Sequence, residues 1–422
     1  MTTLAQKLIA DASATPSAKI GDVVVCAVDL AMIHDSGGPR RVKPILERLG
    51  RDVWNPERVA VVTDHYVPVE SDETKAIQEL TRAWVVNQEI SNFYDQQGIC
   101  HVVLPERGHL KPGMFCVGGD SHSPTGGAFG AYMFGIGATE MAGVLATGEI
   151  WIKVPETVFI HWSGHLNPLV TAKDMMLATC GKIGMGGGRY QAVQYAGDAI
   201  HDLNMQERMT MSNMAAELGG QAGLIAPDET TIAYLQSVGA DVPENWQDYQ
   251  IEQPDLNGEV INFDAAALSP QIAAPHSPEN ADDAEAFKNT PLDVAYIGAC
   301  TGAKYTDLKA AAFVLAHKKI ASHVTLKVAP ASLRDQERAK DEGLMQILQD
   351  AGAEFLPNSC GICAGYGRDR LLENQVCISS TARNFKGRMG APSSQVYLAS
   401  PYTVAASAIA GTMIDPRDVM EA

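Results

Sequence analysis

Short apolar runs that end in aspartate or glycine recur along the first half of the chain and alternate with stretches that have a helical residue pattern. We expect strands at residues 23–28, 58–64, 113–120 and 157–162, and helices at 73–97 and 139–151. This alternation predicts layered α/β domains built on parallel sheets. Ligands of such sheets bind beyond the carboxyl ends of the strands, so polar residues that directly follow a strand are the first candidates for chemistry.

Length and composition set the expected number of domains. A chain of 422 residues, 46% of them apolar, can form about three domains of roughly 150 residues each. The stretch 264–291 carries four prolines, an acidic cluster and little periodicity, so it is predicted to connect domains, and a new strand begins just after it. We therefore expect α/β domains at 1–168, 169–290 and 291–422.

The charge of the chain argues against two classes of partner. Its formal net charge of -18 repels nucleic acids and anionic membrane surfaces. The sequence has no apolar run of about 18 residues, and its first residues lack the basic flank and apolar core of a signal peptide, so we expect a cytoplasmic location. The eight cysteines have no regular short spacing, which indicates a reducing compartment where thiols stay free or bind metal.

Three cysteines of the last expected domain have the spacing of an incomplete metal site. Cys360 and Cys363 form a C-x-x-C pair, and Cys300 lies in the polar turn YIGACTG. A structural zinc ion takes four protein ligands, whereas an iron–sulfur cluster held by three cysteines keeps one iron open to a substrate oxygen or water. The alternatives are a thiol redox pair at Cys360 and Cys363, or a zinc site closed by Cys377 as a fourth thiolate.

Aspartate and histidine residues are paired after two of the predicted strands. Asp64 and His65 are adjacent in VVTDHYVP, Asp120 and His122 stand two apart in GGDSHSPTGG, and His101 lies at a similar junction in GICHVVLP. An aspartate beside a histidine can orient the imidazole for proton transfer. Each pair alone is more often a turn in which the aspartate caps backbone amides, but three such places in one α/β region favour a shared catalytic role.

Positive charge gathers near the C-x-x-C pair of this acidic chain. Arg383 and Arg388 stand five residues apart in the glycine-rich STARNFKGRMG, which predicts a loop. Planar guanidinium groups bind carboxylates through two parallel hydrogen bonds, so two arginines suit a di- or tricarboxylate, although solvated surface charge is the simpler interpretation. The glycine-rich runs FGIGATE and KIGMGGGRYQ complete neither G-x-G-x-x-G nor the P-loop pattern, which argues against a dinucleotide or ATP site.

Five segments, taken in order, resemble the aconitase superfamily: residues 98–140, residues 197–231, YIGACTG, NSCGICAGYG and STARNFKGRMG. In length and spacing the chain is most similar to the large subunits of 3-isopropylmalate dehydratase and their homoaconitase-like relatives. The resemblance implies three α/β/α layered domains of the aconitase type, with the domain boundaries given above. It also implies a [4Fe-4S] cluster at the domain interface on Cys300, Cys360 and Cys363, and it leaves Cys377 as a packing residue.

The resemblance further implies a hydro-lyase that dehydrates a 2-hydroxy di- or tricarboxylate, or isomerises it through dehydration. It assigns the acid and hydrogen-bonding residues around the leaving hydroxyl to Asp64, His65, His101, Asp120 and His122. It places substrate contacts at His34, Asp35, Gln194, Arg383 and Arg388. The carbanion-forming base of the family is a serine in a GSSR-like loop of a swivelling fourth domain; no such sequence occurs here, so we expect that domain in a separate small subunit.

Three positions depart from the family pattern. Gly302 replaces the usual Asn, Gln194 the usual Glu, and Gly127 the His of the isopropylmalate enzymes. The loss of a carboxylate and of an amide side chain near the cluster leaves the substrate open and favours another malate derivative, such as a methylated one. These departures also support an alternative hypothesis, a degenerate or zinc-containing carboxylate-binding protein without catalysis, which the retained cysteines, Asp–His pairs and arginines oppose.

Overall fold

The structure is a computed structural model that describes residues 2–252 and 260–420. Contacts divide the chain into two compact units, Met1–Ser163 with Gly188–Phe263, and Gly164–Gly187 with Asp264–Ala422. Each unit is built on a parallel sheet, as the alternation of strand and helix patterns predicts. The predicted α/β class is therefore confirmed, while the division into three domains stays a prediction.

The first unit contains a five-stranded parallel sheet with the order β4-β3-β2-β5-β6. Its strands are β2 (Leu30–His34), β3 (Val59–Thr63), β4 (Asn92–Asp95), β5 (Phe115–Gly118) and β6 (Tyr132–Gly135). The sequence of β3, VAVVT, is buried throughout, which is typical of a parallel strand covered on both faces. The strand order reverses between β2 and β5, because the chain continues from β2 to one side of the sheet and from β5 to the other.

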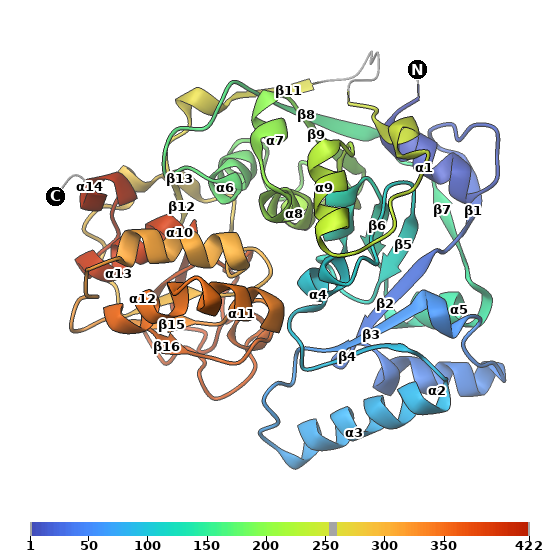
Figure 1. The fold of residues 1–422 in the computed structure, drawn as a ribbon, viewed down its shortest axis with the longest axis horizontal. Helices are drawn as coiled ribbons and strands as arrows, with labels where there is room; N and C mark the ends of the chain where they lie inside the picture. Colours follow the sequence, from blue (N-terminus) through green and yellow to red (C-terminus); the bar gives the residue numbers. More distant parts are fainter. Residues whose placement is uncertain (1, 253–259, 421–422) are drawn as a thin grey trace. The chain divides into compact units, whose positions relative to one another are not determined.

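Helices and two smaller sheets complete this unit. The smaller sheets have the orders β10-β9-β8-β11 and β1-β7, with strands β1 (Val23–Ala27), β7 (Glu149–Lys153), β8 (Thr157–Ser163), β9 (Ala192–Ala196), β10 (Ala222–Ile225) and β11 (Val260–Asp264). The helices are α1 (Leu4–Ala12), α2 (Pro39–Leu49), α3 (Asp72–Asn87), α4 (Cys100–Glu106), α5 (Ala138–Thr147), α7 (Asp198–Asp202), α8 (Met205–Asn213) and α9 (Glu229–Ser237). Figure 1 shows α2 and α3 (blue) beside the strands of the five-stranded sheet.

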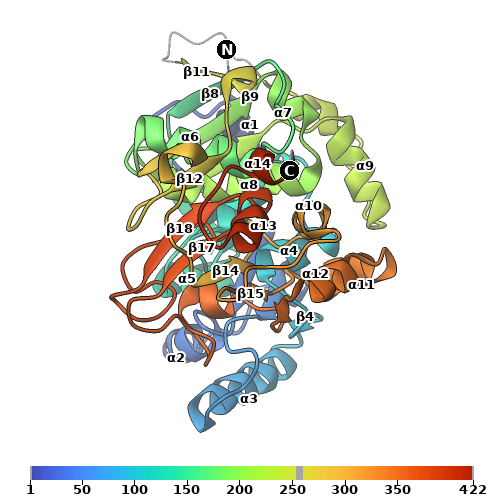
Figure 2. The same ribbon diagram turned by 90° about the vertical axis from the view of Figure 1, so that its left-hand side faces the viewer.

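The second unit contains a seven-stranded sheet with the order β13-β12-β18-β17-β14-β15-β16. The pairs from β18 to β16 are parallel, and β12 and β13 form an antiparallel edge. Figure 2 shows β18, β17, β14 and β15 in this order. The strands are β12 (Gln271–Ala273), β13 (Ala281–Asp283), β14 (Val294–Ile297), β15 (Thr325–Val328), β16 (Glu354–Phe355), β17 (Val376–Ser379) and β18 (Gln395–Ala399). The helices are α6 (Ala172–Ile183), α10 (Tyr305–Leu315), α11 (Leu333–Asp341), α12 (Leu344–Ala351), α13 (Pro401–Ala410) and α14 (Pro416–Met420).

Both helices that the sequence predicts end earlier than expected. The prediction of a helix to residue 97 is wrong beyond Asn87, because residues 92–95 form β4 and pair with β3. The helix predicted to residue 151 ends at Thr147, since Gly148 takes a left-handed conformation at φ 76° and β7 begins at once. The expected connection at 264–291 is also more ordered than predicted, because it supplies β12 and β13 to the seven-stranded sheet. Among residues 2–252 and 260–420, no helix combines the length and apolar character needed to cross a bilayer.

Candidate functional site

The carboxyl edge of the five-stranded sheet gathers seven of the predicted site residues, here called the His–Asp cluster. They lie at the ends of β2 (His34, Asp35), β3 (Asp64, His65) and β5 (Asp120, His122), and in the first turn of α4 (His101). Because the strand order reverses between β2 and β5, this edge is where a doubly wound sheet opens a crevice for a ligand. His101 lies at the junction of β4 and α4, as the second residue of the helix.

Asp64 and His65 form a buried ion pair. Nδ1 of His65 lies 2.6 Å from Oδ1 of Asp64, and the other oxygen of Asp64 accepts the backbone N–H of Cys100 at 2.8 Å. Burial opposes charge on both side chains, but their mutual attraction outweighs it, so the pKa of His65 rises to about 9 and the pKa of Asp64 falls to about 2. At neutral pH the pair is therefore an imidazolium beside a carboxylate.

His34 places a neutral imidazole next to this imidazolium. Its ring stacks on that of His65, with the centroids 4.1 Å apart. The N–H of Gly37 donates to Nδ1 of His34 at 3.4 Å, which leaves the proton on Nε2, and Nε2 donates to the carbonyl of Gly119 at 3.1 Å. Burial, together with the positive charge of His65, lowers the pKa of His34, so this ring stays uncharged.

Asp35 is fully buried and fixes the loop that follows β3. Its carboxylate accepts the backbone N–H groups of Asp64, His65 and Tyr66 at 3.3, 3.1 and 3.0 Å. Oδ1 of Asp35 also lies 3.8 Å from Nδ1 of His65. These contacts give Asp35 a supporting task, and its contact with substrate stays a prediction.

The carboxylate of Asp120 connects the remaining histidines. Its Oδ1 accepts from Nε2 of His101 at 2.7 Å and from the backbone N–H of His122 at 2.8 Å, while Oδ2 lies 3.9 Å from Nε2 of His34. Burial works against the charge, but the hydrogen bond from His101 and the attraction of the nearby histidines hold the pKa of Asp120 well below its usual range. Its side chain keeps 19% of its surface exposed, so solvent or a ligand can reach this acid.

Glu217, which lies outside the sequence motifs described above, belongs to the same network. It lies on the 3-10 helix η3 (Met214–Leu218) and is 1% exposed, and its Oε1 accepts from Nε2 of His122 at 3.0 Å. The two residues are 95 positions apart, so no local motif joins them. The signal in the sequence is one acidic residue within the otherwise apolar run MAAEL.

The His–Asp cluster is suited to proton transfer. Ligand-type atoms lie within 4.8 Å of one another in two groups, one of His34, Asp35, Asp64 and His65, the other of His101, Asp120 and His122. In both groups the carboxylate and imidazole atoms hydrogen-bond to each other. Paired acids and imidazoles with shifted pKa values are typical of general acid–base sites.

Gln194 lies on β9 and donates to backbone carbonyls. Its Nε2 donates to the carbonyl of Ile251 at 2.6 Å and to that of Glu252 at 3.3 Å. An ionised carboxylate has no proton to offer these oxygens, which explains why glutamine replaces the usual glutamate. In the part of the chain that the structure describes, no hydrogen bond joins Gln194 to the His–Asp cluster, and its substrate contact stays a prediction.

Gly127 lies on the 3-10 helix η2 (Ser123–Phe129), packed against β10. A Cβ at this position would lie 1.8 Å from the carbonyl oxygen of Gly223. No side chain fits there unless the backbone moves. The histidine that isopropylmalate enzymes usually have at this position is therefore excluded by the packing of this chain.

The carboxyl edge of the parallel sheet in the second unit gathers the predicted cysteines and arginines. Cys300 follows β14, Cys360 and Cys363 follow β16, and the loop with Arg383 and Arg388 follows β17. The C-x-x-C pair spans a short 3-10 helix, η7 (Gly361–Ala364). Cys300 and Cys363 are buried, and Cys360 and both arginines are half-buried.

Tyr296 on β14 connects the two cysteine motifs. Its ring covers Gly298, two residues before Cys300. Burial raises the pKa of Tyr296 well above its usual range, and the nearby thiols of Cys363 and Cys360 raise it further. The ring therefore lies near the turn that carries Cys300 and near the C-x-x-C pair.

The three thiols are the type of donor that holds an iron–sulfur cluster. Thiolates that share a tetrahedral zinc ion stand roughly 4 Å apart. Within residues 2–252 and 260–420, the groups of His, Cys, Asp and Glu that are close enough for one ion contain no cysteine. In a cluster each cysteine binds a different iron, which places the sulfur atoms farther apart.

Cys377 is a packing residue. It is fully buried on β17, and its thiol donates to the carbonyl of Ile378 at 3.5 Å. Burial raises its pKa well above the usual range. The proposed zinc site closed by Cys377 gains no support from this geometry.

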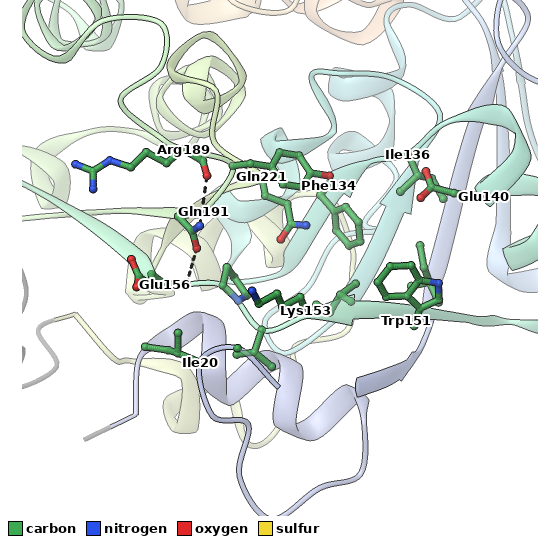
Figure 3. Close-up of a pocket in the computed structure, with 16 residues that line it drawn as sticks. Ile20, Phe134, Ile136, Glu140, Trp151, Lys153, Glu156, Arg189, Gln191 and Gln221 are labelled. Atoms are coloured by element: carbon green, nitrogen blue, oxygen red, sulfur yellow. Dashed lines mark hydrogen bonds between the residues drawn. The ribbon is translucent and has the colours of Figure 1, made fainter. Parts of the chain in front are cut away.

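A separate cavity of about 440 Å³ lies in the first unit and contains none of the predicted site residues. Figure 3 shows its walls, which include Phe134, Trp151, Lys153 and Gln191. Apolar and charged side chains of both signs mix in this lining.

Comparison with known proteins identifies the family. Residues 6–288 and 280–411 match the profile of the Aconitase family, described as aconitate hydratase. The chain is 41% identical to 3-isopropylmalate dehydratase large subunit 1 of Methanopyrus kandleri, over 98% of this chain and 99% of that protein. It is 38% identical to the 3-isopropylmalate dehydratase large subunit of Aquifex aeolicus, over 100% of this chain and 98% of that protein. It is also 38% identical to a probable methanogen homoaconitase large subunit of Methanothermobacter thermautotrophicus, over 98% of this chain and 97% of that protein. The chain therefore belongs to the aconitase family of iron–sulfur hydro-lyases.

Proposed function

We propose that this chain is the large subunit of a dehydratase that removes water from a substituted malate, or isomerises it through dehydration. The observation that supports this most directly is the buried pair of Asp64 and His65, which keeps an imidazolium at neutral pH beside the neutral ring of His34. Hydroxide leaves a 2-hydroxy acid with difficulty at neutral pH, so the departing oxygen needs a proton donor. We assign that role to His65.

The proposed cofactor is a [4Fe-4S] cluster on Cys300, Cys360 and Cys363. When bound, such a cluster supplies an iron without a cysteine ligand, which acts as a Lewis acid on a substrate oxygen. The nearness of both cysteine motifs to Tyr296 supports this ligand set, as does the burial of Cys377 within the strand β17.

The acids of the His–Asp cluster orient the other imidazoles. Asp120 stays ionised and accepts from His101, and Glu217 accepts from His122, so each ring is held in one orientation. We assign both rings to hydrogen bonding around the leaving hydroxyl. A fixed donor near developing charge lowers the barrier, because it does not have to reorient during the reaction.

Arg383 and Arg388 are the proposed clamps for the substrate carboxylates. Proton loss from the carbon beside a carboxylate develops negative charge that guanidinium groups stabilise. The half-buried position of both residues in one loop supports this role, because it combines access with partial desolvation.

The proposed substrates are 2-hydroxy di- or tricarboxylates of the substituted-malate class. The relatives described above are named for 3-isopropylmalate dehydratase and homoaconitase. Gly127 has no room for the usual histidine, and Gln194 replaces a usual glutamate, so we favour a malate with a different substituent, such as a methyl group.

The proposed partner is a small subunit that supplies the serine of the GSSR-like loop as the carbanion-forming base. The names of the relatives, which are large subunits, support a two-subunit enzyme. Three aconitase-type domains, at 1–168, 169–290 and 291–422, and a cytoplasmic location remain part of the proposal.

A substrate screen tests this function. The chain, loaded with iron and sulfide under anaerobic conditions, is assayed with and without a candidate small subunit against a panel of substituted malates, and the unsaturated product is followed by its ultraviolet absorbance. We expect turnover of at least one malate by the pair and negligible turnover by the chain alone. Full activity without the partner contradicts the two-subunit proposal, and an iron-loaded pair that dehydrates no 2-hydroxy acid contradicts the proposed reaction.

A further inference from the structure

One buried side chain, Ser380, joins the turn that carries Cys300 to the loop that carries Arg383. Ser380 directly follows β17 and is fully buried. Its hydroxyl accepts the backbone N–H of Gly298 at 3.0 Å, and it lies 3.1 Å from the carbonyl oxygen of Gly302 and 3.2 Å from that of Gly298. These two glycines flank Cys300 at two residues on either side, so one hydroxyl binds both ends of the turn.

The backbone of Ser380 binds the same segment again. Its N–H donates to the carbonyl of Tyr296 at 3.0 Å, and its carbonyl accepts from Oγ1 of Thr301 at 3.0 Å. The segment 296–302 is thus bonded to one residue through backbone and side chain alike.

Gly302 provides the space that Ser380 needs. A Cβ on Gly302 would lie 2.2 Å from both Cβ and Oγ of Ser380, and 2.5 Å from its carbonyl oxygen. The backbone of Gly302 is not in the left-handed region, so close approach rather than conformation requires glycine here.

Two buried lysines hold the segments on either side of this contact. Nζ of Lys304 donates to the carbonyl of Cys300 at 3.1 Å and pairs with Asp307 at 2.7 Å. Nζ of Lys173, on α6, donates to the carbonyl of Thr381 at 2.5 Å. The hydroxyl of Ser380 lies between these two segments and hydrogen-bonds to the first of them.

We propose that Ser380 is a positioning residue that fixes the Cys300 turn against the arginine loop, and so sets the separation between a cluster thiolate and the carboxylate clamps. The effect of Ser380 on substrate binding rests on the function proposed above. The hydrogen bonds between Ser380 and the Cys300 turn do not depend on that function. Removal of the hydroxyl leaves the buried N–H of Gly298 without its acceptor. The turn and the loop should then open together.

Amide hydrogen exchange of the whole chain tests the link without cofactor or partner. In Ser380→Ala we expect peptides that cover 298–304 and 380–388 to exchange together about tenfold faster, because a buried hydrogen bond that they share is lost. The matched control is Ser407→Ala on α13, which also removes a fully buried hydroxyl that accepts a backbone N–H, that of Ile414 at 3.3 Å. Faster exchange at 380–388 alone, or equal acceleration in the control, would overturn the proposal.

A milder variant keeps the test usable if Ser380→Ala does not fold. Thr301→Val preserves the shape of the side chain and removes its hydrogen bond to the carbonyl of Ser380. We expect about threefold faster exchange in both peptides. A change confined to 298–304 contradicts the link.

The iron-loaded pair of subunits tests the consequence. We expect Ser380→Ala to raise the KM for the best malate about tenfold and to speed the loss of visible absorbance in air, because the clamps and the thiolate no longer keep one separation. Ser407→Ala should change neither. An unaltered KM together with an unaltered rate of bleaching contradicts the proposal. A wild-type pair that binds iron and sulfide but dehydrates no malate contradicts the proposed function instead, and the exchange result then decides the role of Ser380.

Discussion

Nδ1 of His65 donates to Oδ1 of Asp64 across 2.6 Å, inside a pair that is almost completely buried. The attraction between the two charges, together with this hydrogen bond, raises the pKa of the imidazole to about 9 and lowers the pKa of the carboxyl to about 2. Desolvation alone would lower the pKa of His65 and raise that of Asp64. Both groups are therefore charged inside the protein only because the charge of each stabilises that of the other.

Asp64→Asn should therefore destabilise the chain in a pH-dependent way. The raised pKa of His65 contributes stability that is complete below about pH 6.5 and is lost as the pH rises through about 9. The lowered pKa of Asp64 contributes stability above about pH 4 that is lost as the pH falls through about 2. Wild type and variant should differ by on the order of 3 kcal/mol between about pH 4 and 6.5, and less at pH 9.

Urea titrations at pH 6 and pH 9 measure this difference. Asp95→Asn is the control, since Asp95 pairs at 2.8 Å with Arg82, which does not titrate in this range. A difference between wild type and Asp64→Asn that is equal at both pH values contradicts the ion pair.

Glu217→Gln should lower kcat about tenfold to a hundredfold with little change in KM. The substitution keeps the size of the side chain but removes the charge that holds Nε2 of His122 at 3.0 Å. Steady-state kinetics of the reconstituted pair measure the effect. Asp228→Asn is the control, because it breaks a buried 2.6 Å ion pair with Arg208 in the same unit; it should lower stability and leave kcat unchanged. If kcat falls equally in both variants, the loss in Glu217→Gln comes from lower stability, and Glu217 does not orient His122 for catalysis.

Arg383→Lys should raise KM by at least about tenfold and reduce kcat less. Lysine keeps the charge but cannot offer two parallel donors to a carboxylate. Arg417→Lys, which alters an arginine paired with Asp415 in the same unit, serves as the control and should leave KM unaltered. If Arg383→Lys has the KM of the wild type, Arg383 does not bind a carboxylate of the substrate.

Gln194→Glu should become less stable as the pH rises. The introduced carboxyl would face the carbonyls of Ile251 and Glu252, so burial and these acceptors raise its pKa above the unfolded value near 4.3. The protonated form can still donate below about pH 4, and that contribution, about 1–3 kcal/mol, is lost as the pH rises through the raised pKa.

Thermal melts at pH 5 and pH 8 check this prediction. Gln375→Glu is the control, because the oxygen of Gln375 accepts the N–H of Leu372 at 2.8 Å and a carboxylate can accept it equally well. A Tm difference between wild type and Gln194→Glu that does not grow with pH contradicts the assigned hydrogen bonds.

The sequence predicts most of the fold and much of the site because both depend on local patterns. Polar residues that follow buried strands must lie at one edge of a parallel sheet, which explains why Asp64, His65, Asp120 and His122 meet. The ends of the helices could not be predicted in this way, since strand pairing with β3 makes residues 92–95 a strand despite their helical pattern.

Contacts between distant segments account for what the sequence did not predict. Glu217 meets His122 across 95 residues, and the amide of Gln194 meets carbonyls at 251 and 252. The glycine at 302 marks a departure from the family pattern in the sequence, but only the packing of Ser380 against it gives a physical reason.

Serine substitutions should separate the cluster ligands from the packing cysteines. Cys300→Ser, Cys360→Ser and Cys363→Ser should each lose most of the bound iron, because each removes one thiolate ligand. Cys377→Ser is the matched control in the same sheet, and it should retain the wild-type iron content. Iron analysis after anaerobic purification measures the iron content of each variant. If only Cys377→Ser loses its iron, the assignment of Cys300, Cys360 and Cys363 as the cluster ligands is wrong.

The iron and sulfide content of the anaerobically purified wild-type chain, measured together with its visible absorbance, decides whether Cys300, Cys360 and Cys363 hold a cluster. We expect a brown protein with iron and acid-labile sulfide in near-equal amounts. A colourless protein that holds stoichiometric zinc and no sulfide would contradict it.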